Sequence, residues 1–292
     1  MKSSLETKVF STIKDYRLWR SSLQDDGSGR PLLGLVPTMG ALHRGHVTLI
    51  EQARAQCQRV VVSIFVNPLQ FGPNEDFDRY PRTFAKDVEM CSEAGVDAIF
   101  HPAVQEFYPQ PLQEVTRVIP PQCMVNKLDG IFRPGHFEGV ATVVLKLFQV
   151  AQQDCAFFGE KDYQQLQVVK RMVADLNVPT TIVPVPTVRE EDGLALSSRN
   201  VYLTPEERQL APGLHKVLKE VLRESLEDGV PLMQALERGR ARLSEIPGLT
   251  LQYLSACHAE SLEELTEASR PMVVLIAAKL GNVRLIDNVI AP

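Results

Sequence analysis

This sequence has few cysteines and no excess of positive charge. The five cysteines of the 292-residue chain are widely scattered, and no two form a Cys-x-x-Cys pair. This usage argues against a disulfide framework or a zinc site and is typical of buried thiols in a reducing compartment. The 31 Lys and Arg residues are outnumbered by 36 Asp and Glu and form no basic stripe, which argues against a nucleic-acid-binding protein. We therefore expect a cytoplasmic protein that binds no nucleic acid.

Long apolar runs and the common phosphate-binding motifs are absent as well. No uninterrupted apolar stretch approaches the roughly 18–20 residues of a membrane span, and the segment Met1–Phe10 is polar and contains Glu6. We expect neither a membrane span nor a secretory signal. Because neither Gly-x-x-x-x-Gly-Lys-[Ser/Thr] nor Gly-x-Gly-x-x-Gly occurs, P-loop and dinucleotide-fingerprint interpretations have no support.

Apolar runs alternate with helical patterns up to about residue 186. The run at 59–66 is nearly continuous, as expected for a central strand covered on both faces. Because such alternation forms βαβ units, we predict an α/β fold: a Rossmann-like, doubly wound, mostly parallel sheet with a second, smaller α+β domain. The expected strands are 32–36, 59–66, 98–101, 155–158 and 180–185, and the expected helices are 43–56, 83–94, 139–152 and 163–176.

The composition changes after this alternating region. Residues 204–244 are rich in Leu, Glu and Arg and begin with the helix-start pattern Thr-Pro-Glu-Glu, so we expect them to be helical. A proline-bearing, charged stretch at 184–192 marks the boundary between a first domain, 1–186, and a second, 187–292. Three strand-like segments are expected in the second domain, at 249–257, 272–279 and 284–289.

The segment Pro37–His46 reads Pro-Thr-Met-Gly-Ala-Leu-His-Arg-Gly-His and directly follows an apolar run. This pattern predicts a strand that leads through a glycine-bearing turn into a helix, with His43 and His46 on one face of its first turn. Unpaired backbone N–H groups and the helix dipole favour an anion there, and imidazoles add donors suited to phosphate oxygens. From these residues alone, a solvated His pair and a metal pair with ligands elsewhere stay open.

Two polar segments are candidates for substrate binding. Asn67 and Gln70 follow the central strand, where their amides suit a small polar ligand, although Asn-Pro also begins ordinary surface turns. Arg133 and His136 precede an apolar helix. Arg133 can clamp a carboxylate or a phosphate, and the simpler interpretation of His136 is a residue that caps the helix.

Two further segments are candidates for phosphate binding. The stretch Gly159–Asp162 lies at a strand-to-helix junction, where Lys161 can place a point charge near phosphates. Ser197, Ser198 and Arg199 offer two hydroxyls and a guanidinium just beyond the domain boundary. Either segment can also be an ordinary solvated turn.

Taken together, in this order and spacing, these motifs resemble one known family. The histidine segment is similar to the His-x-Gly-His signature of the nucleotidyltransferase superfamily, in the long form found in the pantothenate synthetase (pantoate–β-alanine ligase) family. Asn67–Gly72 with Tyr80-Pro81-Arg82-Thr83 matches that family closely, and Ser197–Arg199 resembles its mobile phosphate loop. The resemblance covers about residues 36–203 and is weaker toward the C-terminus.

The resemblance implies a two-step, ATP-dependent ligase. ATP and (R)-pantoate give pantoyl adenylate and pyrophosphate, and the amine of β-alanine then forms pantothenate and releases AMP. It also implies a nucleotide- and pantoate-binding catalytic domain at 1–186, a C-terminal lid domain at 187–292, Mg²⁺ on the ATP phosphates with Asp87 as its protein contact, and a homodimer.

Residue roles are carried over from the family to matching positions. His46, His43, Lys161, Ser197, Ser198 and Arg199 are the expected catalytic residues, and Gln70, Gln165, Asn67, Arg133 and His136 the expected substrate-binding residues. The expected ATP-binding residues are Pro37, Thr38, Met39, Gly40, Ala41, Leu42, His43, Arg44, Gly45, His46, Gly159, Glu160, Lys161, Asp162, Val188, Leu196, Ser197, Ser198 and Arg199. The alternatives are another adenylyl- or cytidylyltransferase and a nucleotide-sensing module without catalysis.

Overall fold

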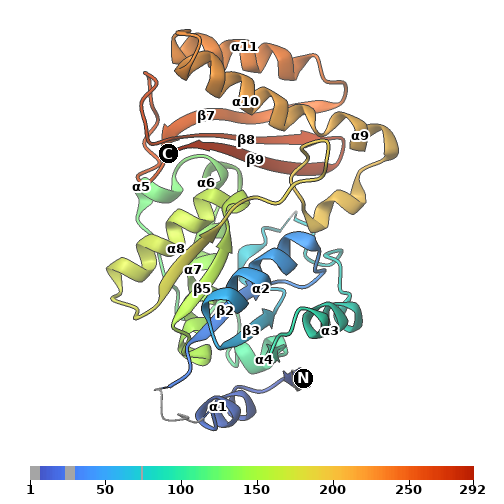
Figure 1. Cartoon of the computed structure of the whole chain (residues 1–292), viewed down its shortest axis with the longest axis vertical. Coiled ribbons are helices and arrows are strands. Elements are labelled where there is room, and N and C mark those ends of the chain that lie inside the picture. The colour runs from blue at the N-terminus through green and yellow to red at the C-terminus, as the bar shows by residue number, and fades with distance from the viewer. Residues whose placement is uncertain (1–6, 24–29, 74) are drawn as a thin grey trace. The chain divides into compact units, whose positions relative to one another are not determined.

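In the computed structural model, which describes residues 7–23, 30–73 and 75–292, the alternating region forms a six-stranded parallel sheet (Figure 1). Its spatial order is β1-β4-β3-β2-β5-β6. The strands are β1 Lys8–Phe10, β2 Leu33–Thr38, β3 Arg59–Ile64, β4 Ala98–Phe100, β5 Cys155–Gly159 and β6 Thr181–Val185. The predicted α/β, Rossmann-like fold class is confirmed.

Helices cover both faces of this sheet. The helices α2 (Arg44–Gln56) and α3 (Phe84–Glu93) lie on one face, and α7 (His136–Ala151) lies with α1 (Ile13–Ser21) on the other (Figure 1). The remaining elements of this region are short helices and α8: η1 Pro68–Gln70, α4 Val104–Phe107, α5 Gln122–Val125, α6 Asp129–Phe132, η2 Glu160–Asp162 and α8 Tyr163–Asp175.

The core under α2 follows from strand periodicity. Val36, Val60 and Val62 of the sheet and Ile50 of α2 are fully buried in one apolar cluster, because alternate strand residues face the same side. A Cβ on Gly34 of β2 would lie 3.1 Å from the Cys57 sulfur and from the Phe157 ring. Glycine therefore lets α2 approach the sheet closely.

The strand order reverses between β2 and β5, which are neighbours in the sheet although β3 and β4 lie between them in sequence. The chain leads from β2 to β3 and β4 on one side, and from β5 to β6 on the other. In open α/β sheets, ligands bind outside the carboxyl ends of the strands at such a reversal. The histidine segment follows β2 and Gly159 ends β5, so both lie at this edge of the sheet.

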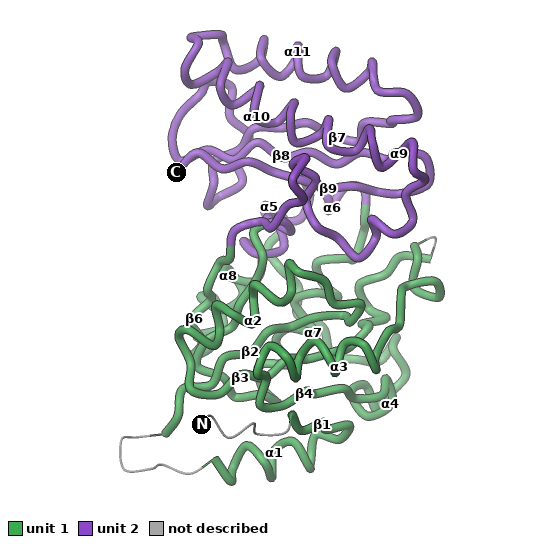
Figure 2. The backbone as a smooth tube through the Cα atoms, turned by 45° about the vertical axis from the view of Figure 1, so that its right-hand side comes forward, with its two compact units in different colours: residues 1–121, 133–160, 168–185 green, residues 122–132, 161–167, 186–292 purple. Residues whose placement is uncertain are grey.

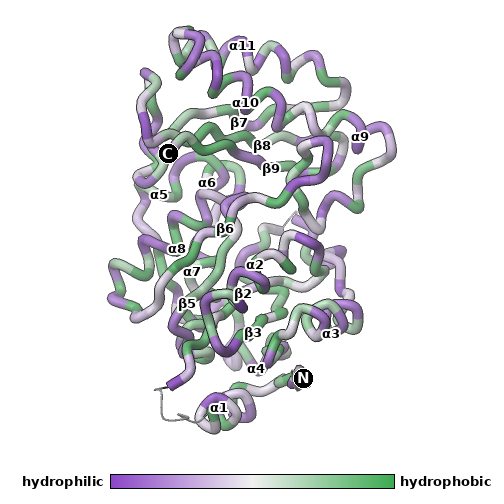
Figure 3. Tube along the Cα trace, in the orientation of Figure 1, coloured by the Kyte–Doolittle hydropathy of each residue, from purple (hydrophilic) through white to green (hydrophobic). Residues whose placement is uncertain are grey.

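The C-terminal region forms a three-stranded antiparallel sheet, β7 (Leu249–His258), β8 (Met272–Leu280) and β9 (Val283–Ala291). Two long helices, α10 (Gly213–Leu226) and α11 (Leu232–Ser244), pack on it. Figure 3 shows β8 as mainly hydrophobic, whereas hydrophobic and hydrophilic residues alternate along α11. β8 is buried at all but one position. The shorter helices here are η3 Ser198–Tyr202 and α9 Pro205–Leu210.

Contacts divide the chain into two compact units (Figure 2). Unit 1 comprises residues 1–121, 133–160 and 168–185, and unit 2 comprises 122–132, 161–167 and 186–292. The predicted domain division at residue 186 stays a prediction, and unit 2 also takes two segments that it assigned to the first domain. In the part of the chain that the structure describes, every helix is too short or too polar to cross a lipid bilayer.

Candidate active site

The two signature histidines build the turn that begins α2. His43 is the N-cap residue, and its Nδ1 accepts a hydrogen bond from the Gly45 N–H at 3.1 Å. The Nδ1 of His46 accepts from the His43 N–H at 3.2 Å, which completes a reciprocal capping box. The roles usually filled by Ser or Thr and by Glu are therefore taken by imidazoles.

This capping fixes the tautomer of both imidazole rings. Because each Nδ1 accepts a backbone N–H, a neutral imidazole carries its proton on Nε2, and we assign that tautomer to both. The ring centroids of His43 and His46 lie 4.1 Å apart. Two Nε2–H donors are thus held together at a helix N-terminus, where backbone N–H groups and the dipole also favour an anion.

A buried carboxylate holds the turn before these histidines. Asp87, on α3, is 1% exposed, and it accepts from the Ala41 N–H at 3.0 Å and the Leu42 N–H at 2.8 Å. Gly40 and Ala41 have φ of +82° and +49°. Since an alanine in the left-handed region is strained, the bonds from Asp87 compensate for this backbone.

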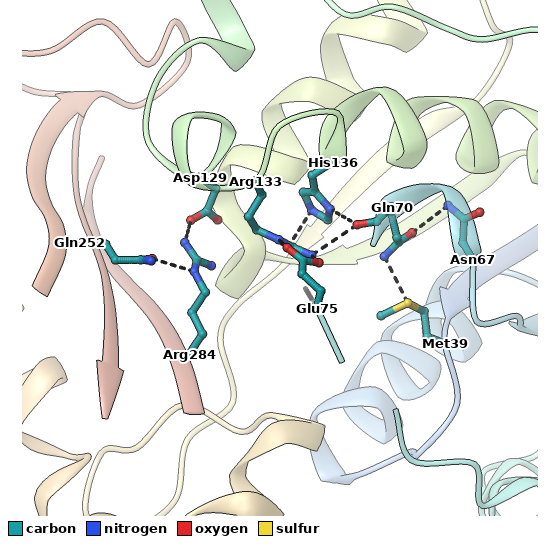
Figure 4. A network of polar contacts seen from close by, with 9 residues as sticks. All are labelled: Met39, Asn67, Gln70, Glu75, Asp129, Arg133, His136, Gln252 and Arg284. Atoms are coloured by element: carbon teal, nitrogen blue, oxygen red, sulfur yellow. Dashed lines mark hydrogen bonds and ion pairs between the residues drawn. The ribbon is translucent and has the colours of Figure 1, made fainter. Parts of the chain in front are cut away.

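Gln70 is held by a buried network at the carboxyl end of β3 (Figure 4). Asn67 donates from Nδ2 to the Gln70 Oε1 at 3.1 Å, and the Gln70 Nε2 donates to the sulfur of Met39 at 3.1 Å. Tyr108 donates its hydroxyl proton to the Asn67 Oδ1 at 3.0 Å, and burial raises the pKa of this phenol. The amide of Gln70 is therefore preset beside the histidine turn.

The structure also explains why α7 can approach this network. A Cβ on Gly139 would lie 2.2 Å from the Leu69 carbonyl oxygen, so only glycine fits. The Gly139 carbonyl itself accepts from the Asn67 Nδ2 at 3.1 Å.

Arg133 and His136, expected to bind substrate, have partners within the protein (Figure 4). Arg133 forms a bidentate pair with Glu75 at 2.7 Å for each bond, and its Nη1 donates to the His136 Nε2 at 3.0 Å. His136 then donates from Nδ1 to the Gln70 carbonyl at 2.8 Å. Burial alone would raise the pKa of Glu75, but the bonds from Arg133 lower it. In this structure both residues support the Gln70 backbone, and their substrate contacts stay a prediction.

The expected site residues are divided between the two units. Unit 1 holds the histidine turn, Asn67, Gln70, Asp87, Arg133, His136, Gly159 and Glu160. Unit 2 holds Lys161, Asp162, Gln165, Val188, Leu196 and Ser197–Arg199. The histidine turn and Gln70 are brought together in unit 1 through Met39.

Within unit 2, a short hairpin leads into the serine–arginine segment. The Leu196 N–H donates to the Val188 carbonyl at 3.0 Å. Ser197 then caps η3, accepting from the Arg199 N–H at 3.3 Å. The cap keeps the turn compact.

Gln165 is half-buried on α8, one residue after a structural glutamine. Gln164 is 3% exposed and donates to the carbonyls of Met124 and Lys127 while accepting from the Asp129 N–H. Gln164 therefore has a structural role, and of the two neighbouring glutamines only Gln165 is exposed enough to contact a ligand.

Sequence reasoning missed several residues that shape the site. Glu75 and Tyr108 carry no motif, and their role is visible only through their contacts with Arg133 and Asn67. Asp287 and Asn288 stand next to each other in a mostly apolar strand that also contains Arg284. This adjacent polar pair was the one signal that could have identified them.

Asp87 was expected to contact Mg²⁺, and its surroundings test that fit. Its Oδ1 accepts from Leu42 and from the Thr83 hydroxyl, and its Oδ2 from Ala41. A carboxylate so buried and so engaged does not fit a direct metal ligand in this arrangement. Within the described residues, no group of three or more His, Cys, Asp or Glu side chains is arranged to hold a metal ion.

Comparisons with known proteins agree over almost the entire chain. The family model for pantoate-beta-alanine ligase matches residues 8–290. The bifunctional pantoate ligase/cytidylate kinase of Synechococcus elongatus is 50% identical over 275 residues, which are 93% of this chain and 50% of that protein. The chain therefore spans half the length of that relative.

Solved structures extend the likeness to the fold. The pantothenate synthetase of Thermus thermophilus has a TM-score of 0.90 and 47% identity, with 97% of this chain and 99% of that chain covered. The pantoate-beta-alanine ligase of Francisella tularensis, complexed with beta-gamma ATP and beta-alanine, has a TM-score of 0.79 and 35% identity, with 97% of each chain covered. The chain belongs to the pantoate–beta-alanine ligase family.

Proposed function

We propose that the chain condenses (R)-pantoate with β-alanine to give pantothenate, through pantoyl adenylate and with release of AMP and pyrophosphate. Family membership supports the reaction. The observation that carries it is the turn in which His43 and His46 both present Nε2–H donors at the start of α2. Adenylation places new negative charge on the α-phosphate, and such donors stabilise it.

The reaction needs ATP because a carboxylate is a poor acyl donor, with oxide as its leaving group. Transfer of AMP to the pantoate carboxylate supplies a good leaving group. The amine of β-alanine then attacks the acyl carbon, AMP leaves, and the amine proton passes to solvent or base. Water must be kept from the acyl adenylate meanwhile.

In this proposal His46 and His43 contact the α- and β-phosphates. Lys161 and Arg199 neutralise the departing pyrophosphate, assisted by the hydroxyls of Ser197 and Ser198. The other predicted ATP-binding residues line the nucleotide.

Gln70 and Gln165 bind the pantoate hydroxyls and carboxylate, and Gln70 also lies near β-alanine. The preset amide of Gln70, fixed by Asn67, supports this role, because a polar group held in place loses little entropy on binding.

We further propose that Mg²⁺ accompanies ATP, that the protein is cytoplasmic and that it forms a homodimer. When bound, Mg²⁺ neutralises phosphate charge. Because the Asp87 carboxylate is occupied by the histidine turn, the ATP phosphates would supply most of the ligands of the ion.

Omission of single components tests the proposed function. With ATP, Mg²⁺, (R)-pantoate and β-alanine together, pantothenate and AMP should form in equal amounts. Without β-alanine, pantoate-dependent exchange of pyrophosphate into ATP should continue. A nucleotide-linked end product with no dependence on β-alanine would instead identify another nucleotidyltransferase, and binding without turnover would identify a sensing module.

A further inference from the structure

Two adjacent buried polar residues stand in β9 of unit 2, a mostly apolar strand that also carries Arg284. Asp287 and Asn288 are 6% and 4% exposed, while the strand also contributes apolar side chains such as Leu285 to the core beneath α10 and α11. Neighbouring strand residues face opposite sides of a sheet. One strand therefore presents a polar group to each side.

Asp287 holds the hairpin that precedes Ser197. Its carboxylate accepts two hydrogen bonds from Arg189, at 2.7 and 2.9 Å. The same guanidinium donates to the Gly193 carbonyl at 3.1 Å and to the Asn288 carbonyl at 3.0 Å. Arg189 thus joins the hairpin tip to β9.

The hairpin is also packed closely at this point. Gly193 has φ of +96°, and a Cβ there would lie 3.0 Å from the His215 ring. The Nδ1 of His215 lies 3.6 Å from the Asp287 Oδ2. A shift of the Asp287 carboxylate would therefore displace the hairpin, both through the bonds to Arg189 and through the packing of Gly193 against His215.

Asn288 holds the other phosphate-facing segment. Its Nδ2 donates to the Lys161 carbonyl at 3.0 Å. This bond fixes the main chain from which the Lys161 side chain extends, and that side chain is 18% exposed, with its Nζ 3.8 Å from the Asp162 carboxylate. Lys161 and the hairpin are far apart in sequence, yet they are bonded to adjacent residues of one strand.

We propose that Asp287 and Asn288 are positioning residues that fix the Lys161 backbone and the hairpin 188–196 relative to each other for the adenylation step. The inference rests on the proposed function. Neither residue is assigned contact with a substrate. Their arrangement acts through Lys161 and Ser197–Arg199, whose charges and hydroxyls face the triphosphate only while it is present.

The purely structural alternative is a buried ion pair that holds the sheet together. Such pairs add little net stability compared with apolar residues of similar size, so stability alone does not account for this pair. A pair used only for stability would affect both half-reactions equally. A pair used for positioning would affect adenylation selectively, because pyrophosphate is gone before the amide forms.

The test compares the two half-reactions in Asp287→Asn and Asn288→Asp. Both substitutions preserve side-chain shape and change the hydrogen bonds. The rate of pantoate-dependent ATP–pyrophosphate exchange at saturating ATP should fall ~10–100-fold, because small misplacements of catalytic groups lower rates by such factors. Amide formation from chemically prepared pantoyl adenylate and β-alanine should keep most of its wild-type rate.

Glu224→Gln is the matched control. Glu224 is a buried carboxylate on α10 of the same unit. It pairs with Arg238 and Arg242, neither of which is a proposed phosphate-binding residue. The variant should lose comparable thermal stability and retain both rates. If Asp287→Asn does not fold, Asn288→Asp, which removes the Nδ2 donor to the Lys161 carbonyl, carries the test.

The outcomes of this test distinguish failure of the positioning role from failure of the proposed function. Equal losses in both half-reactions, or full exchange activity in folded variants, would overturn the positioning role. A wild-type chain that makes no pantothenate would instead overturn the proposed function, because the wild type is assayed alongside and does not depend on the variants.

Discussion

Replacing Asp87 distinguishes a residue that holds the histidine turn from a residue that binds Mg²⁺. The carboxylate accepts from the N–H groups of Ala41 and Leu42 and from the Thr83 hydroxyl. Asp87→Asn preserves the shape but turns one acceptor oxygen into an NH₂ donor. At least one bond to the turn must then be lost.

The size of the effect follows from burial. Loss of the acceptor for a buried backbone N–H costs ~1–3 kcal/mol, out of a total stability of about 5–15 kcal/mol. The variant should therefore fold with a measurably lower free energy of unfolding. Release of Ala41 from its strained φ of +49° also displaces the histidines, so ATP–pyrophosphate exchange should fall ~10–100-fold.

Urea unfolding in a metal chelator and exchange titrated with Mg²⁺ separate the two roles. A turn-holding residue lowers stability without metal and leaves the Mg²⁺ requirement nearly unchanged. Unchanged stability in chelator, together with a raised Mg²⁺ requirement, would refute this reasoning. Asp97→Asn is the control, because the Asp97 side chain is only 9% exposed and accepts from the Val60 N–H at 2.8 Å. That variant should lose stability and keep exchange.

Three further predictions concern single side chains. His46→Ala should lower the rate of ATP–pyrophosphate exchange ~10²–10³-fold, with a smaller effect on ATP binding. The control is His258→Ala, which removes another histidine whose Nδ1 accepts backbone N–H groups and should leave the exchange rate unchanged. Equal exchange rates in the two variants would reject the role of His46 in adenylation. Gln70→Ala should raise the pantoate KM by the equivalent of ~1–3 kcal/mol and leave the ATP KM nearly unchanged, while Gln153→Ala, which removes another buried amide, should change neither KM. Burial, and to a lesser degree Arg189, lowers the pKa of His215 from 6.5, so its folded form resists protonation. The unfolding free energy should then fall as pH drops below about 6.5, and His215→Gln should flatten that slope in urea unfolding; an unchanged slope would exclude His215 as its source.

The strands were predictable because most are buried on both faces and carry uniform apolar runs. The predicted strand 59–66 corresponds to β3, Arg59–Ile64, and 155–158 to β5, Cys155–Gly159. The missed strand, β1, has three residues and lies at the sheet edge with two of them exposed. Such a strand depends on its partner β4 more than on its own composition.

The site was predictable where its geometry is local. A helix start at 43–56 was expected, and α2 begins at Arg44. One detail differs: His43 lies just outside the helix as its N-cap, so the histidines meet through reciprocal capping as well as through helical spacing. The acceptor that holds the turn, Asp87, lies 45 residues from Leu42, and no local pattern identifies such a partner.

Lys161 lies in the same compact unit as Arg199, on the other side of the predicted domain boundary. The predicted boundary at residue 186 separates Lys161 from Arg199, which makes their joint action on pyrophosphate depend on closure of one domain over the other. In the structure both residues belong to unit 2. Asn288 bonds the Lys161 carbonyl, and Asp287 holds Arg189 in the hairpin before Ser197. The main chain of Lys161 and the hairpin before Ser197 are therefore held by contacts within one compact unit. Joint action of Lys161 and Arg199 on pyrophosphate is then no reason by itself to expect closure of one domain over the other.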